Sequence, residues 1–200
     1  MKGKYYVIEG LDGTGKSTLI NKLKEAHPEW IFVAEPGGTP IGQTLRALVK
    51  EGLGEETITP ISELLMFSAA RTQLLSQIIA PALAEGKTVI SDRNWVSTLM
   101  YQGHGFGTSA INTVLELHKL ILKDLPVPTG YLYLSLSMEQ RALRLRHRGE
   151  EPDRLESRNS DYYVRVHAGY EAWAKANPNV FKLDASKSSD DVFTTALTFI

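Results

Sequence analysis

Apolar residues follow two alternating patterns along the chain. Short apolar runs suited to buried strands occupy residues 5–9, 30–34, 87–91, 130–136 and 180–184. Between these runs, apolar residues recur with the spacing of an amphipathic helix, as in 61–85, 109–122 and 188–199. This alternation predicts an α/β fold, in which a parallel sheet of five strands is covered by helices on both faces.

Three of the predicted helices carry further expectations. The 61–85 helix should kink or end at Pro81, which lacks a backbone N–H. A helix through residues 97–102 should end at Gly103 and Gly105. The 109–122 helix has one apolar stripe, formed by Ile111, Val114, Leu115, His118 and Ile121. That stripe suits an interior face or a subunit contact, so His118 is expected to be an interior or interface histidine.

The first predicted strand runs directly into a phosphate-binding loop. Residues 10–17 read Gly-Leu-Asp-Gly-Thr-Gly-Lys-Ser, and a helical pattern begins at Thr18. Glycines let backbone N–H groups surround phosphate oxygens, and the helix N-terminus adds its positive dipole end. In this motif Lys16 reaches the β- and γ-phosphates, and the Ser17 hydroxyl can bind Mg²⁺. An ordinary glycine-rich turn would not need Gly-Lys-Ser between a strand and a helix.

Polar residues follow two other predicted strands, where ligands bind in open α/β sheets. Asp92 and Arg93 follow the third strand, so Asp92 can hold Mg²⁺ and Arg93 can bind phosphate. A surface ion pair is the alternative for these two residues. The loop at 35–40 follows the second strand and could equally be a plain turn. Phe67 and Arg71 share one helix face, although taken alone they suit a core residue and a solvated charge.

Arginines and aromatic residues gather in the last third of the chain. Six arginines lie between 141 and 158, interrupted by Gly-Glu-Glu-Pro at 149–152: Arg141, Arg144, Arg146, Arg148, Arg154 and Arg158. They suit a mobile lid that supplies charge to a transferring phosphoryl group, with a solvated face or a nucleic-acid patch as alternatives. The aromatic stripe is expected to be core: Tyr162, Tyr163, Tyr170 and Trp173.

Composition narrows the class of protein. The 200 residues are 42% hydrophobic and 22% charged, which is typical of a single globular domain covering 1–200. The net charge of −1 argues against broad nucleic-acid binding. There is no cysteine, hence no disulfide framework. No apolar run approaches the ~20 residues of a membrane span, and no signal peptide is expected at the N-terminus. We therefore expect a cytoplasmic enzyme with no membrane partner.

Taken in order, these motifs resemble those of the thymidylate kinase family, over nearly the whole chain. The resemblance implies a three-layer P-loop NTPase-type fold with a mobile lid at about 141–158. It also implies transfer of the ATP γ-phosphoryl group to dTMP, giving dTDP and ADP, with Mg²⁺. The residues that carry it are Gly10 to Thr18, Glu35-Pro36-Gly37-Gly38-Thr39, Phe67-Ser68-Ala69-Ala70-Arg71, Asp92-Arg93, Ser97, Tyr101-Gln102-Gly103 and Arg148 to Arg154.

The resemblance assigns roles to individual residues. Asp12 would meet the 3′-hydroxyl, Phe67 would stack on thymine, and Arg71 would bond its carbonyl edge. Arg93 would bind the acceptor phosphate, and Tyr101 would crowd the 2′ position. The remaining acceptor contacts would come from Glu35, Pro36, Arg46, Ser97 and Gln102. ATP would contact Gly10, Asp12, Gly13, Thr14, Gly15, Lys16, Ser17, Thr18, Arg144, Arg148 and Arg154, and the metal would contact Ser17 and Asp92.

The family places its catalytic arginine either in the phosphate loop or in the lid. Gly13 follows Asp12 here, so the loop has no arginine, and Arg148 is the best candidate. Catalysis would then rest on Lys16, Arg93, Arg148 and Asp12. Two positions depart from the family pattern: Ala34 replaces an arginine, and Asn94 replaces an aromatic residue or histidine. Ala34 removes a contact that is either to the acceptor phosphate or structural. Asn94 leaves open that bases other than thymine are accepted.

Two rival functions remain at this point. One is another, or broader, nucleoside or nucleotide kinase on the same scaffold. The other is a regulatory GTP-binding switch, but the chain lacks the Asn-Lys-x-Asp motif that reads guanine. The resemblance also implies a homodimer, for which the 109–122 stripe is the only support in the sequence.

Overall fold

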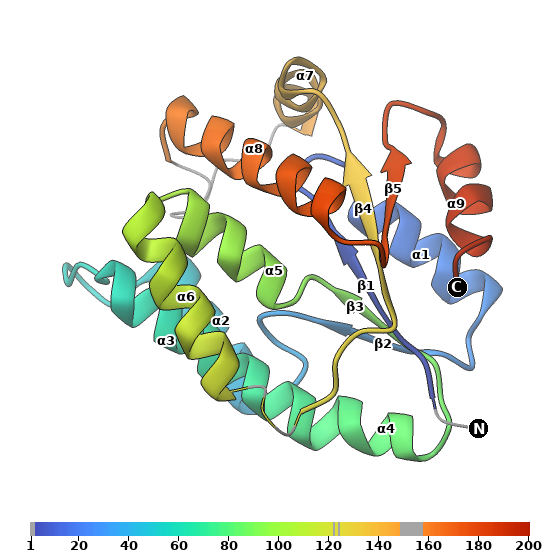
Figure 1. Cartoon of the computed structure of the whole chain (residues 1–200), viewed down its shortest axis with the longest axis horizontal. Coiled ribbons are helices and arrows are strands. Elements are labelled where there is room, and N and C mark those ends of the chain that lie inside the picture. The colour runs from blue at the N-terminus through green and yellow to red at the C-terminus, as the bar shows by residue number, and fades with distance from the viewer. Residues whose placement is uncertain (1–2, 122, 124, 149–157) are drawn as a thin grey trace.

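The computed structural model describes residues 3–121, 123, 125–148 and 158–200, apart from the side chains of Thr108 and Arg148. Its centre is a parallel sheet with the strand order β2-β3-β1-β4-β5 (Figure 1). The strands are β1 Tyr5–Glu9, β2 Ile31–Ala34, β3 Val89–Asp92, β4 Gly130–Ser135 and β5 Val180–Asp184. The predicted five-stranded parallel sheet is therefore confirmed, with β2 and β3 starting one and two residues later than expected.

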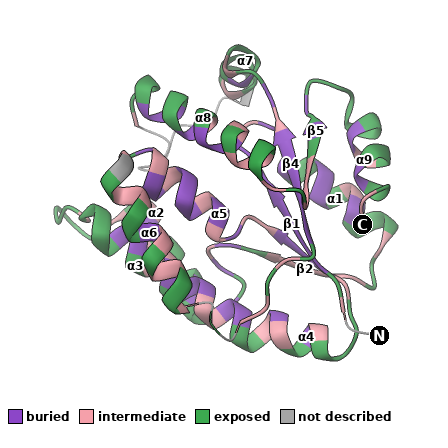
Figure 2. Cartoon of the chain, viewed as in Figure 1, coloured by how far each residue is buried: buried purple, intermediate pink, exposed green. Residues whose placement is uncertain are grey.

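Helices cover both faces of this sheet. On one face, α1 Lys16–Ala26 and α9 Ser189–Leu197 enclose a core that includes Ile8, Leu23 and Leu132. The alternating side chains of the same strands point to the other face, where Tyr5, Val7 and Tyr133 join a larger core. Figure 2 shows the central strands as mostly buried. The chain thus has the three layers that the resemblance implied.

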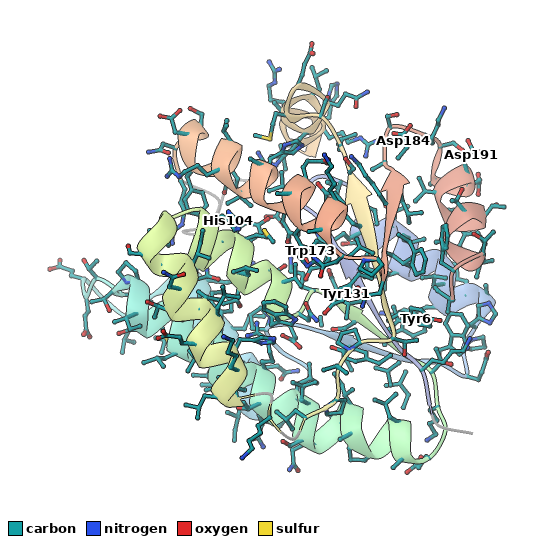
Figure 3. All side chains as sticks on the ribbon, in the orientation of Figure 1. Tyr6, His104, Tyr131, Trp173, Asp184 and Asp191 are labelled. Carbon is teal, nitrogen blue, oxygen red and sulfur yellow. The ribbon has the colours of Figure 1, made fainter. Side chains whose placement is uncertain are left out.

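The second face carries most of the helices. They are α3 Pro60–Leu74, α4 Ala80–Ala84, α5 Trp95–Thr98, α6 Thr108–Ile121 and α8 Ser160–Ala176, with the π-helical segments η1 Leu75–Ile79 and η2 Leu99–His104. The predicted aromatic stripe lies on α8 and joins this core; Trp173 meets Tyr131 of β4 edge to face at 5.0 Å (Figure 3). The remaining helices are α2 Pro40–Glu51 and α7 Met138–Arg148.

The structure shows how two of the predicted helices end. The 61–85 helix continues past Pro81 to Ala84, because the π-helical turn η1 comes just before it. Ala80 bonds the carbonyl of Leu75, and Pro81 falls in the first turn of α4, where its missing N–H costs little. Gly103 does not end its helix either. It lies inside η2, where its small size allows close approach to Ile111, and Gly105 follows the last residue of η2.

The apolar stripe of α6 is used inside the chain. Val114 is buried, and Ile111 and Leu115 pack against the same core. His118 stacks on Trp95 with the ring centres 3.6 Å apart. His118 is therefore an interior histidine, while Ile111, Leu115 and Ile121 stay partly exposed, so a subunit contact of this stripe remains a prediction. Among the helices of the described residues, none is both long and apolar enough to cross a bilayer.

Candidate active site

The phosphate-binding loop joins β1 to α1, as its sequence predicts. Gly13 and Gly15 have φ values of 87° and 95°, which a residue with a side chain rarely adopts. Lys16 begins α1 and is only 7% exposed. Its Nζ donates to the carbonyls of Gly10 and Leu11, both at 3.1 Å. Burial, followed by the charge of Arg93, lowers the pKa of Lys16 despite the nearby carboxylates.

Two cavities border this loop. One has a volume of about 310 Å³ and opens at the carboxyl ends of β1, β2 and β3. The other, of about 520 Å³, lies between the loop, α7 and the start of α9. Asp12, Lys16 and Ser17 line both cavities. The loop can therefore reach two ligands at once, one in each cavity.

The smaller cavity brings together residues from distant parts of the sequence. All of the residues predicted to contact the acceptor lie on its wall, namely Asp12, Glu35, Pro36, Arg46, Phe67, Arg71, Arg93, Ser97, Tyr101 and Gln102. The wall also includes residues that the sequence did not single out for this site, among them Thr98 and Tyr162. In the larger cavity, the predicted Gly13, Thr14, Gly15, Thr18 and Arg144 are joined by Lys187 and Ser189. Gly10 closes the loop by accepting from Lys16 but does not line that cavity.

Arg93 and Asp12 form the charged centre of the smaller cavity. Arg93 has a left-handed backbone (φ 70°), and its guanidinium lies over the Tyr101 ring. Its Nη2 donates to Asp12 Oδ1 at 2.6 Å, and its Nη1 donates to Ser97 Oγ at 2.9 Å. Burial alone would raise the pKa of Asp12, but Arg93 and Lys16 outweigh burial and hold the pKa far below its usual value. Asp12 is therefore ionised, and Arg93 is aimed at the loop.

Asp92 supplies an unused oxygen to the same cavity. It pairs with Ile8 in the register of β3 and β1, which brings it close to the loop. Its Oδ1 is buried and has no hydrogen-bond partner among the described residues. No group of three or more His, Cys, Asp or Glu side chains in the described parts of the chain forms a metal cage. One free carboxylate oxygen near Ser17 and a phosphate loop suits Mg²⁺, which usually binds few protein ligands.

Comparison with known proteins identifies the family. The family model for thymidylate kinase matches residues 8–196. The chain is 39% identical over 196 residues to the thymidylate kinase of Legionella pneumophila (strain Corby), covering 96% of this chain and 91% of the relative. It is 40% identical over 200 residues to that of Photobacterium profundum, with coverage of 96% and 93%. The chain belongs to the thymidylate kinase family.

A solved structure agrees with this assignment. The crystal structure of thymidylate kinase from Ehrlichia chaffeensis superposes with a TM-score of 0.74 at 25% identity, covering 99% of this chain and 98% of that one. The fold is thus that of a P-loop NTPase. Family membership makes the chain an ATP-dependent nucleoside monophosphate kinase.

In this thymidylate kinase framework, Arg71 is a buried site residue rather than a solvated charge. It is 6% exposed, and its Nε donates to Glu35 Oε2 at 2.7 Å. Its Nη2 donates to Thr98 Oγ1, also at 2.7 Å. Glu35 precedes a cis peptide bond to Pro36, and its Oε1 is buried without a partner among the described residues. Burial raises the pKa of Glu35, although Arg71 opposes that shift.

Glu9 is a site residue that the sequence analysis missed. It ends β1, is fully buried and accepts four hydrogen bonds. Its Oε1 accepts from the backbone N–H groups of Asn94 and Ser97 at 3.0 and 3.2 Å. Its Oε2 accepts from Ser97 Oγ at 2.7 Å and from Tyr170 OH at 2.8 Å. A carboxylate ending an otherwise apolar strand just before the loop is the signal that could have identified it.

The arginine cluster does not form one uniform face. Arg141 is 7% exposed and donates to the backbone carbonyl of Asp12 at 3.0 Å. Arg144 donates to the Ala185 carbonyl at 2.7 Å and to that of Thr14 at 3.4 Å. Arg146 is exposed and, within the described parts of the chain, bonds only inside α7. The 149–152 loop and Arg154 lie outside the described residues, as does the side chain of Arg148, so the lid remains a prediction.

Proposed function

We propose that this chain transfers the γ-phosphoryl group of ATP to dTMP, with ATP in the larger cavity and dTMP in the smaller one. The observation that carries this proposal is the sharing of Asp12, Lys16 and Ser17 by both cavities. Direct transfer between two nucleotides requires their phosphates to meet at one point, in line and shielded from water. No covalent intermediate is needed.

Charge stabilisation is the main task of the site in this reaction. Lys16 would leave the carbonyls of the loop to contact the β- and γ-phosphates of ATP. Arg93 would exchange Asp12 for the acceptor phosphate, and Ser97 would keep the guanidinium oriented during that exchange. Asp12 would then be available to the 3′-hydroxyl of the acceptor. The ionised state of Asp12 suits a hydrogen-bond acceptor for that hydroxyl.

Mg²⁺ is the expected metal, with Ser17 and Asp92 as its protein contacts. When bound, it would neutralise charge on the phosphate oxygens. The partnerless Oδ1 of Asp92 supports this choice. Lid arginines would add the remaining charge, with Arg148 as the catalytic candidate and Arg154 as its neighbour.

Recognition of the base would involve Phe67 and Arg71, which lie one helical turn apart on α3. The Arg71 guanidinium is held by Glu35 and Thr98, so it is preorganised for a carbonyl. Tyr101 donates to Asp12 at 3.3 Å and would crowd the 2′ position of the sugar. Arg46 would contact the acceptor from α2; it bonds the Pro36 carbonyl at 3.2 Å.

A homodimer in the cytoplasm completes the proposal. Family membership is its main support. Besides the partly exposed α6 stripe, exposed apolar residues of α2 and α3 offer a face for a second copy: Ile41, Ile61 and Leu65 are each more than half exposed. A monomer by light scattering at working concentration would contradict this part alone.

Product analysis tests the proposed reaction directly. The protein is incubated with ATP, Mg²⁺ and each of dTMP, dUMP, dCMP and thymidine, and the products are separated by chromatography. We expect dTDP and ADP in equal amounts from dTMP, and little ADP without an acceptor. Comparable rates with several monophosphates would favour the broader kinase, which Asn94 leaves open. Slow hydrolysis of GTP with no acceptor dependence would favour the regulatory switch.

A further inference from the structure

Arg158 occupies an unusual position just before α8. Its Nη2 donates to both carboxylate oxygens of Glu63, each at 3.1 Å. Its guanidinium lies against two aromatic rings, 4.6 Å from the centre of Phe106 and 4.9 Å from that of Tyr162. An arginine held by an ion pair and two ring faces is well fixed in place. Arg158 therefore acts as an anchor for Glu63, not as a solvated charge.

Glu63 links Arg158 to the wall of the smaller cavity. It lies on α3 and is 1% exposed. Gln102 Nε2 donates to Glu63 Oε1 at 2.9 Å, and Gln102 lines the cavity. A carboxylate paired with arginine can only accept hydrogen bonds, so the NH₂ group of Gln102 must face it. The carbonyl Oε1 of Gln102 makes no hydrogen bond in the described part of the chain and is left for a ligand.

The same anchor holds the neighbouring backbone. Tyr162, whose ring packs on Arg158, donates from its hydroxyl to the carbonyl of Tyr101 at 2.7 Å. Residues 101 and 102 are thus fixed from two directions. Glu63, Phe67 and Arg71 are spaced four apart on α3 and share one face. Gln102 therefore contacts α3 at Glu63, one helical turn before Phe67, which we assign to the base.

We propose that Arg158 is a positioning residue that acts through Glu63 to orient the Gln102 amide, so that the pocket presents a hydrogen-bond acceptor to the nucleotide base. This inference rests on the proposed function. Thymine carries an N–H at position 3 and can donate to Gln102 Oε1, whereas cytosine has a lone pair there. The oriented amide would therefore favour dTMP over dCMP, because a wrong base leaves two acceptors facing each other.

Glu63→Gln tests the orientation directly. In this variant Arg158 donates to the carbonyl of the introduced amide, which leaves the NH₂ group of that amide facing Gln102. Gln102 must then turn to accept, and it presents its own NH₂ group to the base. We expect the KM for dTMP to rise about tenfold, as for the loss of one hydrogen bond in a buried site. The ratio of kcat/KM for dTMP over dCMP should fall by about tenfold or more, with the KM for ATP unchanged.

Arg158→Met and Arg165→Met form a matched pair of variants. Methionine keeps much of the apolar volume between the two rings but removes the ion pair. Arg165, on α8 itself, donates to the Gly105 carbonyl at 3.0 and 2.7 Å and does not line the cavity. Arg158→Met should lower the dTMP-to-dCMP ratio, Arg158→Lys should retain most of it, and Arg165→Met should leave it unchanged.

The outcomes separate this inference from the proposed function. Failure of the unaltered protein to phosphorylate dTMP would overturn the proposed function itself. An active protein whose dTMP-to-dCMP ratio is unchanged in Glu63→Gln and Arg158→Met would overturn only the positioning role. An equal loss in Arg165→Met would also overturn it, because the effect would then be a general loosening of α8. Should Glu63→Gln fail to fold, the three arginine variants decide the question.

Discussion

Arg93 and Asp12 are joined by a hydrogen bond of 2.6 Å between Nη2 and Oδ1, although they lie 81 residues apart in the sequence. Lys16 lies 3.9 Å from the same Oδ1. One carboxylate thus holds two cations at the meeting point of the two cavities. Protein oxygens hold both cations beside the loop, and we expect phosphate oxygens to replace those protein oxygens when substrates bind.

The first prediction concerns Lys16. In Lys16→Ala we expect transfer from ATP to dTMP to be nearly abolished, because no other residue in the loop can bridge the β- and γ-phosphates. A coupled assay of ADP release measures this, with thermal unfolding as the check on folding. Near-normal turnover in a folded Lys16→Ala protein would remove the central claim about the loop.

The second prediction separates the two substrates. Arg71→Ala should raise the KM for dTMP by about tenfold or more, since the buried guanidinium that we propose bonds the base is lost. The KM for ATP should change little, because Arg71 does not line the larger cavity. Steady-state kinetics with each substrate varied in turn supply both values. An equal rise in the two KM values would mean that Arg71, through Glu35 and Thr98, only supports the fold.

The third prediction concerns Glu9. Glu9→Gln keeps the shape of the side chain but cannot accept all four hydrogen bonds. Its carbonyl would stay on the two backbone N–H groups, so its NH₂ group would face Ser97 Oγ and Tyr170 OH, and Ser97 Oγ already accepts from Arg93. We expect Ser97 to lose its position and Arg93 its orientation, so that kcat/KM for dTMP falls by about tenfold or more. Tyr170→Phe removes one of these bonds and serves as the milder comparison. If both variants kept full activity, Glu9 would have no part in orienting Arg93.

The contrast between Glu9 and Lys16 shows what the sequence could reveal. The phosphate-binding loop was predictable because its residues are adjacent in the sequence, and the role of each residue type can be explained from its neighbours. The parallel sheet and the two helical layers followed from periodicity. Glu9 bonds residues that lie 85 to 161 positions further along the chain. Glu63 and Arg158, which bond each other, are 95 residues apart. Such pairs have no local signature, so only the folded chain brings them together.

The helix details were unpredictable for a different reason. Proline normally ends a helix because it has no backbone N–H to donate. The π-helical turn before Pro81 shifts the hydrogen-bond pattern, so the helix continues through the proline. That turn depends on packing of Leu75 and Ile79 into the core, which a single-sequence pattern does not reveal. The same holds for the α6 stripe. Its spacing fitted an outer face and an inner face equally, and in the structure it packs on Trp95 and the core while Ile111 and Leu115 stay partly exposed.

The fourth prediction concerns stability at acid pH. Burial, followed by the charge of Arg71, lowers the pKa of His118 from 6.5 to about 4. Because the pKa in the folded state is depressed, the unfolded state binds the proton first. The contribution of neutral His118 is therefore complete above pH 6.5 and is lost as the pH falls toward 4. One pKa unit corresponds to about 1.4 kcal/mol, but solvent screens this half-buried ring, so we expect a loss of about 1–2 kcal/mol.

Denaturant unfolding between pH 7 and pH 4 measures this effect. In His118→Phe, which can still stack on Trp95, the free energy of unfolding should fall less steeply over this range. His147→Gln, at an exposed position on α7, is the control and should keep the steep fall. Parallel curves for the protein and the His118→Phe variant would show that folding does not lower the pKa of His118.

The last prediction concerns the lid. Gly13 leaves the phosphate loop without an arginine, and the guanidinium groups of Arg141 and Arg144 are bonded to backbone carbonyls. Arg158 is bonded to Glu63. Arg146 is exposed and donates to the Ala142 carbonyl within α7. Among the six arginines, Arg148 and Arg154 therefore remain as candidates to meet the transferring phosphoryl group. Arg148 ends α7, whose earlier residues contact the loop.

An arginine that acts mainly in the transition state should lower kcat when it is removed, with little effect on ground-state binding. We expect Arg148→Ala to lower kcat by about two orders of magnitude or more, with the affinity for ATP little changed. Arg154→Ala should have a similar or smaller effect, and the double variant should lose less than the sum if the two act as a unit. Arg146→Ala, an exposed arginine on the same helix, is the matched control and should retain activity. Unchanged kcat in both single variants and in the double variant, with chemistry shown to be rate-limiting, would mean that these two arginines are only a solvated charged face.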